Sequence, residues 1–542
     1  MRKWIVFLGA MSLLPGMARV GLASEPLVQW HFLGTARLAG NTNAAGLREI
    51  CSMPSTRHLV EVTLQKLAAQ PHLFFGGAVG TNSSAATQLR TLFNDLIGAE
   101  SIGEFRGAPN QPSEWTMAVR LDETKATSWR GRWDDLLTAI GAGRLQEKKE
   151  GDFSGWEASR PSPQLRCRLA RVGDWLVCGW GPAALPAHSA MCQRLKAGGV
   201  VGPAGDGWVD LQANLARLAP MWGWPAYVDW PELQLTAAGN GANLKTQGKL
   251  KFSEPLGLQL EKWHIPTNTI RDPLTSFTAA QGMKGWLGKR AWTHQLDLNP
   301  PPNQFFGWAM STSPFETYFG FPVQNATGTL QRATPQLAGF VHSNFSWLTV
   351  GQLAVQTNTG QVFWQGLPIA IPFLWPASGQ NNNFIEAGIL PVDAPKRKPA
   401  PPELFAQVTG RTNLVYYDWE ITEQRLFTYR QLFSYYSMMH GYRQAETNDV
   451  IDAWQMDDKV LKHLGNTVTE LSVTSPRELT LLRSSTAGLT GFEFALLIRW
   501  LDNAAFPGYQ APELVSSKKK RTAPKTPGAP PPPAVKPATP RP

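Results

Sequence analysis

The sequence predicts an α+β fold with antiparallel sheets and packed helices in two or three units, followed by a disordered C-terminal tail. Segments in which apolar and polar residues alternate lie between segments with the spacing of amphipathic helices. A Gly-Asn-Gly turn at residues 239–241 joins two strand segments, which is typical of an antiparallel hairpin. Each unit combines a hairpin with helices, and this recurrence suggests duplication, although no aligned repeat is visible.

The chain is too long for one hydrophobic core. Its 542 residues suit two or three domains, and the 43% hydrophobic content is sufficient for globular folding. The 22 tryptophans are an excess, and prolines are abundant, with 43 in the chain. We place boundaries where the composition changes, which gives a signal peptide (1–23), an N-terminal α+β unit (24–205), a strand- and loop-rich middle unit (206–394), a Pro- and Lys-rich linker (395–402), a C-terminal α+β unit (403–515) and a tail (516–542).

The net charge of +10 comes from the two ends of the chain. Arg2, Lys3 and Arg19 lie at the start, and seven more basic residues lie beyond position 516, where no acid occurs. Without these residues the chain has 41 basic and 41 acidic side chains. A neutral body disfavours a basic groove, so we do not expect nucleic acid as a partner.

The N-terminus has the pattern of a secretory signal. Two basic residues precede the apolar run 4–14, and the small residues Gly21 and Ala23 offer a cleavage site. We expect export to the periplasm or cell envelope, with an uncleaved anchor as the alternative. No later segment reaches 18 apolar residues, so the mature body is not expected to span a membrane.

The tail at residues 516–542 has no aromatic residue and no acid, so it cannot form a core and should be disordered. Its basic charge could tether the protein to an anionic envelope polymer or to another envelope protein, or it could be a solvated terminus. The sequence leaves the oligomeric state undetermined.

In the first unit we expect strands at 27–34, 100–106 and 114–121, and helices at 43–51, 56–69, 85–97, 124–140 and 187–196. The middle unit should hold strands at 232–237, 242–252 and 256–265. Pro273 at a first helical position predicts a helix from there to Ala280. Residues 292–390 contain many turn signals and few helical periods, so we expect strands and long loops there.

The last unit is built around a strand at residues 414–421 that leads into a helix. By the period of two, Val415, Tyr417, Trp419 and Ile421 share one face, which we expect to be buried against the helix that carries Leu426, Tyr429, Phe433 and Tyr436. A helix at 449–464, strands at 467–474 and 477–484, and a helix at 491–503 complete the unit.

The opposite face of this strand carries the candidate catalytic residues. Asp418 and Glu420 lie beside Tyr416, with Cβ atoms roughly 7 Å apart, which suits an acid and base pair at a glycosidic bond. The alternative is an ordinary solvated strand face, because alternation produces such pairs often. Apart from this pair the sequence contains no catalytic motif, no metal-ligand spacing and no cofactor fingerprint, so we expect neither a metal nor a cofactor.

Aromatic residues provide candidate binding positions. Tyr416, Trp222, Trp224 and Trp230 could present flat faces to a sugar or to a partner, and core packing is the alternative for each.

The four cysteines, Cys51, Cys167, Cys178 and Cys192, are disulfide candidates in an exported protein. The hairpin at residues 165–181 places Cys167 opposite Cys178 if its loop is centred on Val172 and Gly173, which leaves Cys51 for Cys192. A strict two-residue turn at Gly173 and Asp174 instead places Cys167 opposite Trp180, and four free thiols are the further alternative.

Three segments resemble a group of uncharacterised exported bacterial proteins: GRTNLVYYDWEI at 410–421, SSTAGLTGFEF at 484–494 with Arg499, Trp500 and Leu501, and the opening WHFLGTARLAGNTNAAGLREI at 30–50. The resemblance implies export and a shared architecture, and it implies no activity. We therefore expect an exported envelope protein that acts by binding or scaffolding and is not an enzyme. The alternatives are a carbohydrate-active hydrolase that uses Asp418 and Glu420, and a carrier of lipid or another apolar ligand.

Overall fold

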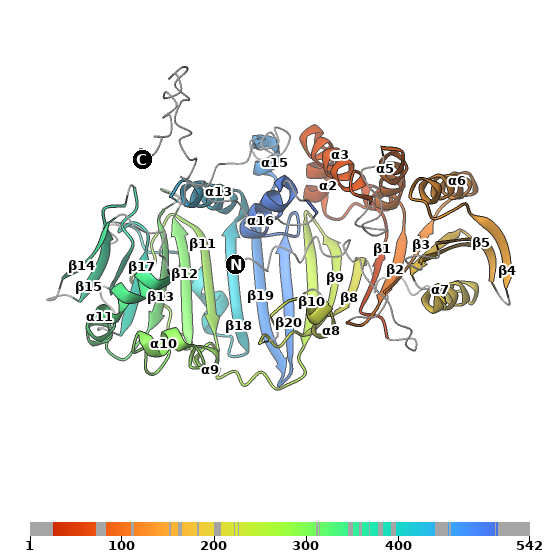
Figure 1. Cartoon of the computed structure of the whole chain (residues 1–542). Coiled ribbons are helices and arrows are strands. Elements are labelled where there is room, and N and C mark those ends of the chain that lie inside the picture. Colours follow the sequence, from red (N-terminus) through yellow and green to blue (C-terminus); the bar gives the residue numbers. More distant parts are fainter. Residues whose placement is uncertain are drawn as a thin grey trace, which may run out of the picture.

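A computed structural model describes residues 25–507, apart from positions 72–82, 110–112, 151–152, 161–164, 182–183, 200–206, 222, 226, 311–312, 314, 345–350, 357–359, 368, 378–382, 392–396, 440–453, 455–456 and 504–505. The fold is α+β, as predicted. Its centre is one large antiparallel sheet of 20 strands, with helices packed on it (Figure 1).

The first ten strands are β1 (Val28–Phe32), β2 (Ser101–Arg106), β3 (Glu114–Arg120), β4 (Gln146–Glu150), β5 (Phe153–Arg160), β6 (Leu165–Val172), β7 (Trp175–Gly181), β8 (Gly207–Asn214), β9 (Glu232–Asn240) and β10 (Asn243–Lys251). The second ten are β11 (Leu274–Gln281), β12 (Gln304–Met310), β13 (Thr317–Pro322), β14 (Gln352–Gln356), β15 (Gln361–Gln365), β16 (Phe373–Pro376), β17 (Phe384–Gly388), β18 (Leu414–Ile421), β19 (Asn466–Ser475) and β20 (Glu478–Ser485).

The strand order shows that the fold is duplicated. In space the first half runs β4-β5-β6-β7-β3-β2-β1-β8-β9-β10. The second half repeats this order as β14-β15-β16-β17-β13-β12-β11-β18-β19-β20. The halves join where β10 pairs with β20, and all these pairings are antiparallel. The middle unit expected at 206–394 is therefore divided between the halves, with β8 to β10 in the first half and β11 to β17 in the second.

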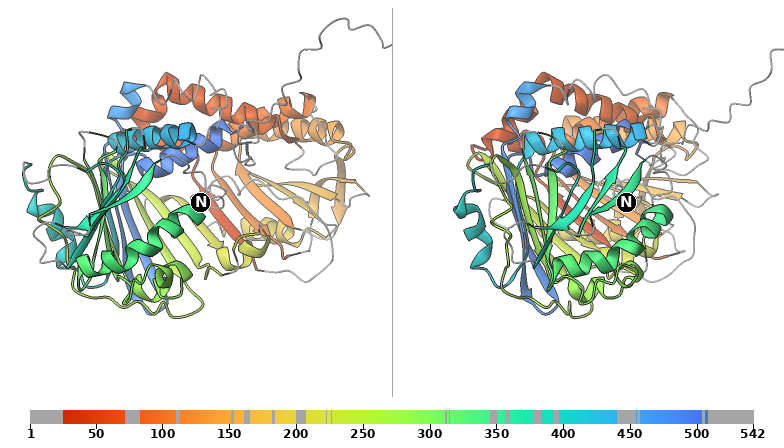
Figure 2. Two further views of the ribbon diagram at one scale, coloured as in Figure 1. Left: turned by 60° about the vertical axis from the view of Figure 1, so that its left-hand side comes forward. Right: turned by 90° about the vertical axis from the view of Figure 1, so that its left-hand side faces the viewer.

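The helices are α1 (Thr35–Ala39), α2 (Ala45–Ser52), α3 (Pro54–Ala68), α5 (Ser83–Gly98), α6 (Glu123–Ala139), α7 (Pro186–Lys196), α8 (Leu215–Met221), α9 (Lys284–Leu287), α10 (Ala291–Gln295), α11 (Ala326–Asn344), α12 (Pro402–Thr409), α13 (Thr422–Met439), α15 (Asp458–Lys462) and α16 (Gly491–Asp502). Helices α3, α5, α6, α13 and α16 lie in a row along one side of the sheet (Figures 1 and 2). The two halves differ most in length between their first two central strands: α1, α2, α3 and α5 lie between β1 and β2, whereas α9 and α10 lie between β11 and β12.

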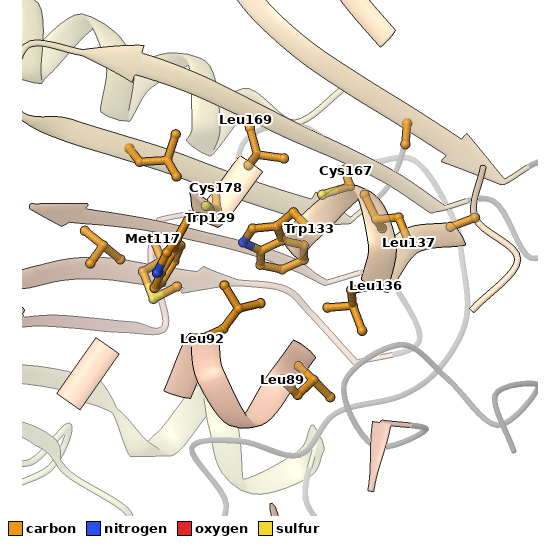
Figure 3. Close-up of a cluster of buried hydrophobic side chains, with 14 of the residues drawn as sticks. Leu89, Leu92, Met117, Trp129, Trp133, Leu136, Leu137, Cys167, Leu169 and Cys178 are labelled. Atoms are coloured by element: carbon orange, nitrogen blue, oxygen red, sulfur yellow. The ribbon is translucent and has the colours of Figure 1, made fainter. Parts of the chain in front are cut away.

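The largest core of the first half lies under α5 and α6. Trp129 and Trp133 of α6 point toward Leu89 and Leu92 of α5 and toward the sheet (Figure 3). Both tryptophans are buried, and rings of this size remove a large apolar area from water. This core explains part of the tryptophan excess.

The two halves are also joined through their helices. Side chains of α3 pack with α13, α15 and α16 in one apolar cluster that includes Trp454 and Ile498. The Trp454 indole donates to Thr56 at 3.0 Å, and the Lys66 ammonium donates to the Leu501 carbonyl at 2.9 Å. These contacts hold α16 against the second half of the sheet, at the pocket described below.

Three local predictions for the middle of the chain are wrong. The expected helix from Pro273 to Ala280 is strand β11, residues 256–265 form no strand, and α11 is a long helix in the region expected to hold strands and loops. Strand β11 lies between β12 and β18, with Phe277 and Ala279 fully buried. Ladders on both edges outweigh the helical preference of its alanines, because strand preference depends mainly on packing.

Candidate functional site

A polar pocket lies between the sheet of the second half and two helices. Its cavity of about 320 Å³ is lined from β11, β18, β19, β20, α13 and α16. The lining residues are Thr278, Tyr416, Asp418, Glu420, Arg425, Tyr429, Thr469, Arg483, Thr490, Phe492 and Glu493. We refer to this site as the polar pocket. Most of these side chains are hydrogen-bonding groups, so the pocket suits a polar ligand.

Two carboxylates from β18 form the floor of the polar pocket. Asp418 is 8% exposed and accepts a hydrogen bond of 2.5 Å from the Thr278 hydroxyl. Glu420 is 3% exposed and accepts one of 2.6 Å from the Gly491 backbone N–H. Burial raises the pKa of both, and in Glu420 burial and the neighbouring Asp418 raise the pKa to about 7. Carboxyl groups with such pKa values are common at functional sites.

Two arginines face these carboxylates and are held in different ways. Arg483 of β20 pairs with both oxygens of Glu493 at 2.7 and 3.0 Å, and it also donates to the Thr469 hydroxyl. Arg425 of α13 is 7% exposed and donates one hydrogen bond of 2.6 Å to the Tyr429 hydroxyl. Its Nε and Nη1 atoms are buried and have no partner. Such groups are costly to bury, so a ligand that accepts hydrogen bonds from them would stabilise the pocket.

Helix α16 begins at the pocket and is positioned by its cap. Thr490 and Glu493 form a capping box, in which the Thr490 N–H donates to Glu493 at 2.8 Å and the Glu493 N–H donates to the Thr490 hydroxyl at 3.2 Å. Gly491 then lies against α13, because a Cβ there would be 2.7 Å from the Leu426 amide nitrogen. The absence of a side chain allows the N-terminus of α16 to reach Glu420.

Equivalent positions in the first half are apolar. The two halves can be aligned by matching the junction between β8 and α8 with the junction between β18 and α13. In this alignment Gln247 of β10 is equivalent to Leu482 of β20. These two residues also pair with each other, as expected if a two-fold axis relates the halves. One row of paired residues is Trp30, Leu211, Leu235 and Gly248 in the first half. The same row is Thr278, Asp418, Thr469 and Arg483 in the second half.

The next row shows the same contrast. Val28, Ala213 and Leu233 in the first half correspond to Ser276, Glu420 and Thr467 in the second. In the first half these side chains belong to, or pack against, an apolar core under α8, which contains Leu218. The same backbone arrangement is therefore formed without any polar group, so the polar pocket is not a requirement of the fold.

The structure corrects our expectation for the two faces of β18. We expected α13 to cover Val415, Tyr417, Trp419 and Ile421, whereas α13 and α16 cover the other face and Tyr429 lies at the pocket with Asp418. Tyr417 packs instead with Phe277 and with Phe405 of α12. A bulge at residues 414–416 also moves Leu414 to the face of Tyr417. Both faces are covered, so neither carboxylate is on a solvated surface.

The candidate binding residues lie in different places. Tyr416 lines the polar pocket, and burial raises its pKa strongly. Trp224 is buried in the core under α8, where its ring lies 4.8 Å from that of Trp230, and the Trp230 indole donates to the Pro225 carbonyl. Core packing therefore accounts for both rings. Trp222 lies outside the described residues.

Sequence reasoning missed three important pocket residues, which are Thr278, Arg425 and Arg483. Thr278 and Arg483 come from strands far away in the sequence, so no local pattern connects them to Asp418. Arg425 is one of two arginines among the aromatic residues of α13, and it lies four positions before Tyr429. The Thr-x-x-Glu spacing of Thr490 and Glu493 is a recognisable capping signal, and it predicts the start of α16.

The cysteines have free thiols. Cys167 lies opposite Trp180 in the β6–β7 ladder, which is the register of the strict two-residue turn and not that of the even loop. Cys178 and Cys192 are buried, and burial raises the pKa of Cys167 to about 12 and that of Cys192 to about 11. Cys51 is exposed on α2. The buried thiols stay protonated and pack as apolar side chains.

The predicted signal peptide (1–23) and tail (516–542) lie outside the described residues, and so do Lys396 and the residue before it in the linker. Export and tethering therefore stay predictions. Within the described ranges no helix is long and apolar enough to cross a membrane. Among the same residues no group of three or more His, Cys, Asp or Glu side chains has the arrangement of a metal site.

The raised pKa of Glu420 gives a prediction for stability. An ordinary glutamate has a pKa of 4.5 and Glu420 has one of about 7, so between these values the unfolded chain loses a proton that the folded chain keeps. The free energy of unfolding should therefore fall as the pH rises from about 4.5 to about 7, by roughly 3 kcal/mol from this group. Urea denaturation across this range should show a smaller fall for Glu420→Gln than for wild type.

Burial also raises the pKa of Glu386 to about 7, so the free energy of unfolding of Glu420→Gln should still fall with pH over this range, although less than in wild type. Identical pH profiles for Glu420→Gln and wild type would contradict a buried, proton-binding Glu420.

Comparison with protein-family models, curated proteins and solved structures found no match. The pocket therefore has to be interpreted from its own chemistry.

Proposed function

We propose that this protein is an exported envelope protein that binds a small polyhydroxylated ligand, such as a sugar, in the polar pocket. The observation that carries the proposal is the contrast between the halves. The apolar residues Leu211 and Ala213 of the first half are replaced at the equivalent positions of the second half by the ionisable residues Asp418 and Glu420. Buried charges reduce stability unless they are paired, so a polar set that the fold does not need points to a ligand.

The chemistry of the pocket suits hydroxyl groups. A sugar hydroxyl both donates and accepts hydrogen bonds, and the pocket offers carboxylate acceptors next to the partnerless N–H groups of Arg425. Phe492 is 40% exposed and packs on Tyr429 with ring centroids 5.0 Å apart, so it gives an apolar surface at the rim. A cavity of about 320 Å³ is at the small end of ligand pockets, which favours a monosaccharide over a longer chain.

Hydrolysis of a glycoside is the second candidate. It is favoured by the raised pKa of Glu420, which would keep a general acid protonated near neutral pH, next to the second carboxyl group of Asp418. The lipid-carrier alternative has less support, because the lining of the polar pocket is rich in ionisable groups.

Binding can be tested by isothermal titration of the full chain with a panel of monosaccharides and disaccharides. We expect at least one sugar to bind, and we expect Arg425→Met to weaken it by about tenfold or more, because the ligand loses its charged donor. Among the described residues the Arg425 side chain donates one hydrogen bond, to Tyr429, and methionine has a similar length, so circular dichroism of the variant should match that of wild type.

Arg430→Met is the matched control. Arg430 is on the same helix, but it lines a second cavity of about 450 Å³ on the other side of α13. Its replacement should leave the affinity unchanged. Analysis of the sugars after incubation separates the two candidates, since cleaved products would indicate the hydrolase and intact sugars the binding protein. No binding by any member of the panel would refute the proposal.

A further inference from the structure

Asp418 and Glu420, the two β18 carboxylates of the polar pocket, form no direct ion pair, although Arg425 lies near enough to offset part of the rise in pKa that burial causes in both, and Arg483 part of that in Asp418. Asp418 is hydrogen-bonded to the Thr278 hydroxyl, and Glu420 to the Gly491 N–H. In the part of the chain that the structure describes, no Lys, Arg or His nitrogen lies within 4.0 Å of either carboxylate, although ion pairs of this length occur elsewhere in the fold. A buried carboxylate without a directly paired cation is unusual, because the charge is costly to remove from water.

The other charged groups at the pocket are already committed. Arg483 is neutralised by its two-point contact with Glu493. The Arg425 guanidinium lies 4.5 Å from the centre of the Tyr429 ring and donates to the hydroxyl of that residue. Tyr416 and Tyr429 are the remaining titratable groups of the lining, and burial raises the pKa of both, so they stay neutral. Threonines from β11 and β19 do not titrate. Because Arg483 is paired with Glu493, the two carboxylates Asp418 and Glu420 share one arginine, Arg425.

This balance leaves room for one positive charge in the ligand. The carboxylates come from alternate positions on one strand face, so an ammonium group between them can donate to both. The free Nε and Nη1 groups of Arg425 need oxygen acceptors close by. The ligand should therefore carry an amine next to hydroxyl oxygens.

We propose that the ligand of the polar pocket has a primary ammonium group that lies between Asp418 and Glu420, with neighbouring hydroxyl oxygens that accept hydrogen bonds from Arg425, as in an amino sugar. This inference rests on the proposed function and specifies its ligand class.

Ligand binding is then coupled to proton release. The empty pocket holds a proton on its carboxyl pair near neutral pH, because burial raises the pKa of Glu420 to about 7. An arriving ammonium stabilises the ionised form, so one carboxyl proton leaves to solvent as the ion pair forms, and no covalent bond changes apart from that O–H bond. Affinity should rise as the pH rises toward 7, as long as the amine itself stays protonated.

The test is isothermal titration of the full chain at pH 6.5 with glucosamine, N-acetylglucosamine and glucose. Acetylation removes the charge from the same sugar, and glucose lacks the nitrogen. We expect glucosamine to bind at least about tenfold more tightly than the other two, as a charge-assisted contact to a buried carboxylate predicts. Titrations in buffers with different ionisation enthalpies should show release of a proton for glucosamine only.

Two variants complete the test. Asp418→Asn keeps an acceptor for the Thr278 hydroxyl, and it should reduce the preference for glucosamine over glucose by about tenfold. Glu423→Gln removes one negative charge from the same region of α13 but lies at the second cavity, so the preference should be unchanged.

Equal binding of glucosamine and glucose without proton release would overturn the inference and leave sugar binding intact. The same preference in Asp418→Asn as in wild type would also overturn it. Binding of none of the three sugars would likewise overturn the inference, whereas the proposed function itself fails only if no sugar of the wider panel binds, so the two failures can be distinguished.

Discussion

Gly491→Ala is expected to lower the free energy of unfolding by about 3 kcal/mol, although the change adds a single methyl group. The new Cβ would lie 2.7 Å from the Leu426 nitrogen and 2.9 Å from the Thr422 carbonyl oxygen. Both contacts are to backbone atoms of α13, which cannot rotate away as a side chain can. The helices α13 and α16 would have to separate, and Glu420 would lose the N–H that it accepts from Gly491.

Gly131→Ala is the matched control for this variant. Gly131 is exposed in the middle of α6, and a Cβ there would meet no atom within 4 Å. Alanine is a better helix former than glycine, so this variant should gain about 0.5 to 1 kcal/mol. Urea denaturation followed by circular dichroism measures both effects. A gain in both variants would mean that α13 and α16 are not packed as closely as described above.

Ala213→Glu should destabilise the first half by about 3 kcal/mol or more at pH 7. Ala213 occupies the position equivalent to Glu420, and it is buried in the apolar core under α8. The first-half row that contains Leu211 and Leu235 has no arginine, because the equivalent of Arg483 is Gly248. The new carboxylate would therefore be buried without compensation. The loss should be smaller at pH 4, where the carboxyl is protonated.

Gln212→Glu provides the control on the neighbouring residue, which is exposed and points to the other face of β8. Its effect should stay within about 0.5 kcal/mol. Thermal and urea unfolding of the two variants at pH 4 and pH 7 test the comparison. If Ala213→Glu were tolerated as well as Gln212→Glu, an ionisable group would carry no cost at this position. The contrast between the halves would then give no reason to assign a ligand to the polar pocket.

A large part of the local structure could be predicted from the sequence. The strand at residues 414–421 and the helix that follows it are β18 and α13. The hairpin predicted from the Gly-Asn-Gly run is β9–β10, with its two-residue turn at Gly241 and Ala242. The helix expected at 491–503 is α16, with its C-terminal end one residue earlier. These elements were predictable because alternation, helical spacing, turn residues and capping residues are all properties of short segments.

Predictions failed where distant segments decide the structure. Strand β11 looks helical by composition, but it is paired on one side with β18, which is about 140 residues away. The carboxylates of β18 looked like a solvated face because a buried acid is costly. They are buried because α13 and α16 cover them and because Thr278 and Gly491 supply hydrogen bonds from other parts of the chain.

The sequence by itself determined the α+β class, the antiparallel hairpins and the pair of carboxylates on one side of β18, because each depends on neighbours along the chain. Only the tertiary structure decided that the chain forms two equivalent halves of one sheet. It also decided that those carboxylates line a pocket with Arg425 and Arg483. The physical reason is that the ladders and the helix contacts join residues far apart in sequence. Whether a polar side chain contacts water or a buried arginine is therefore determined by the distant segments that pack on it, and not by the segment to which it belongs.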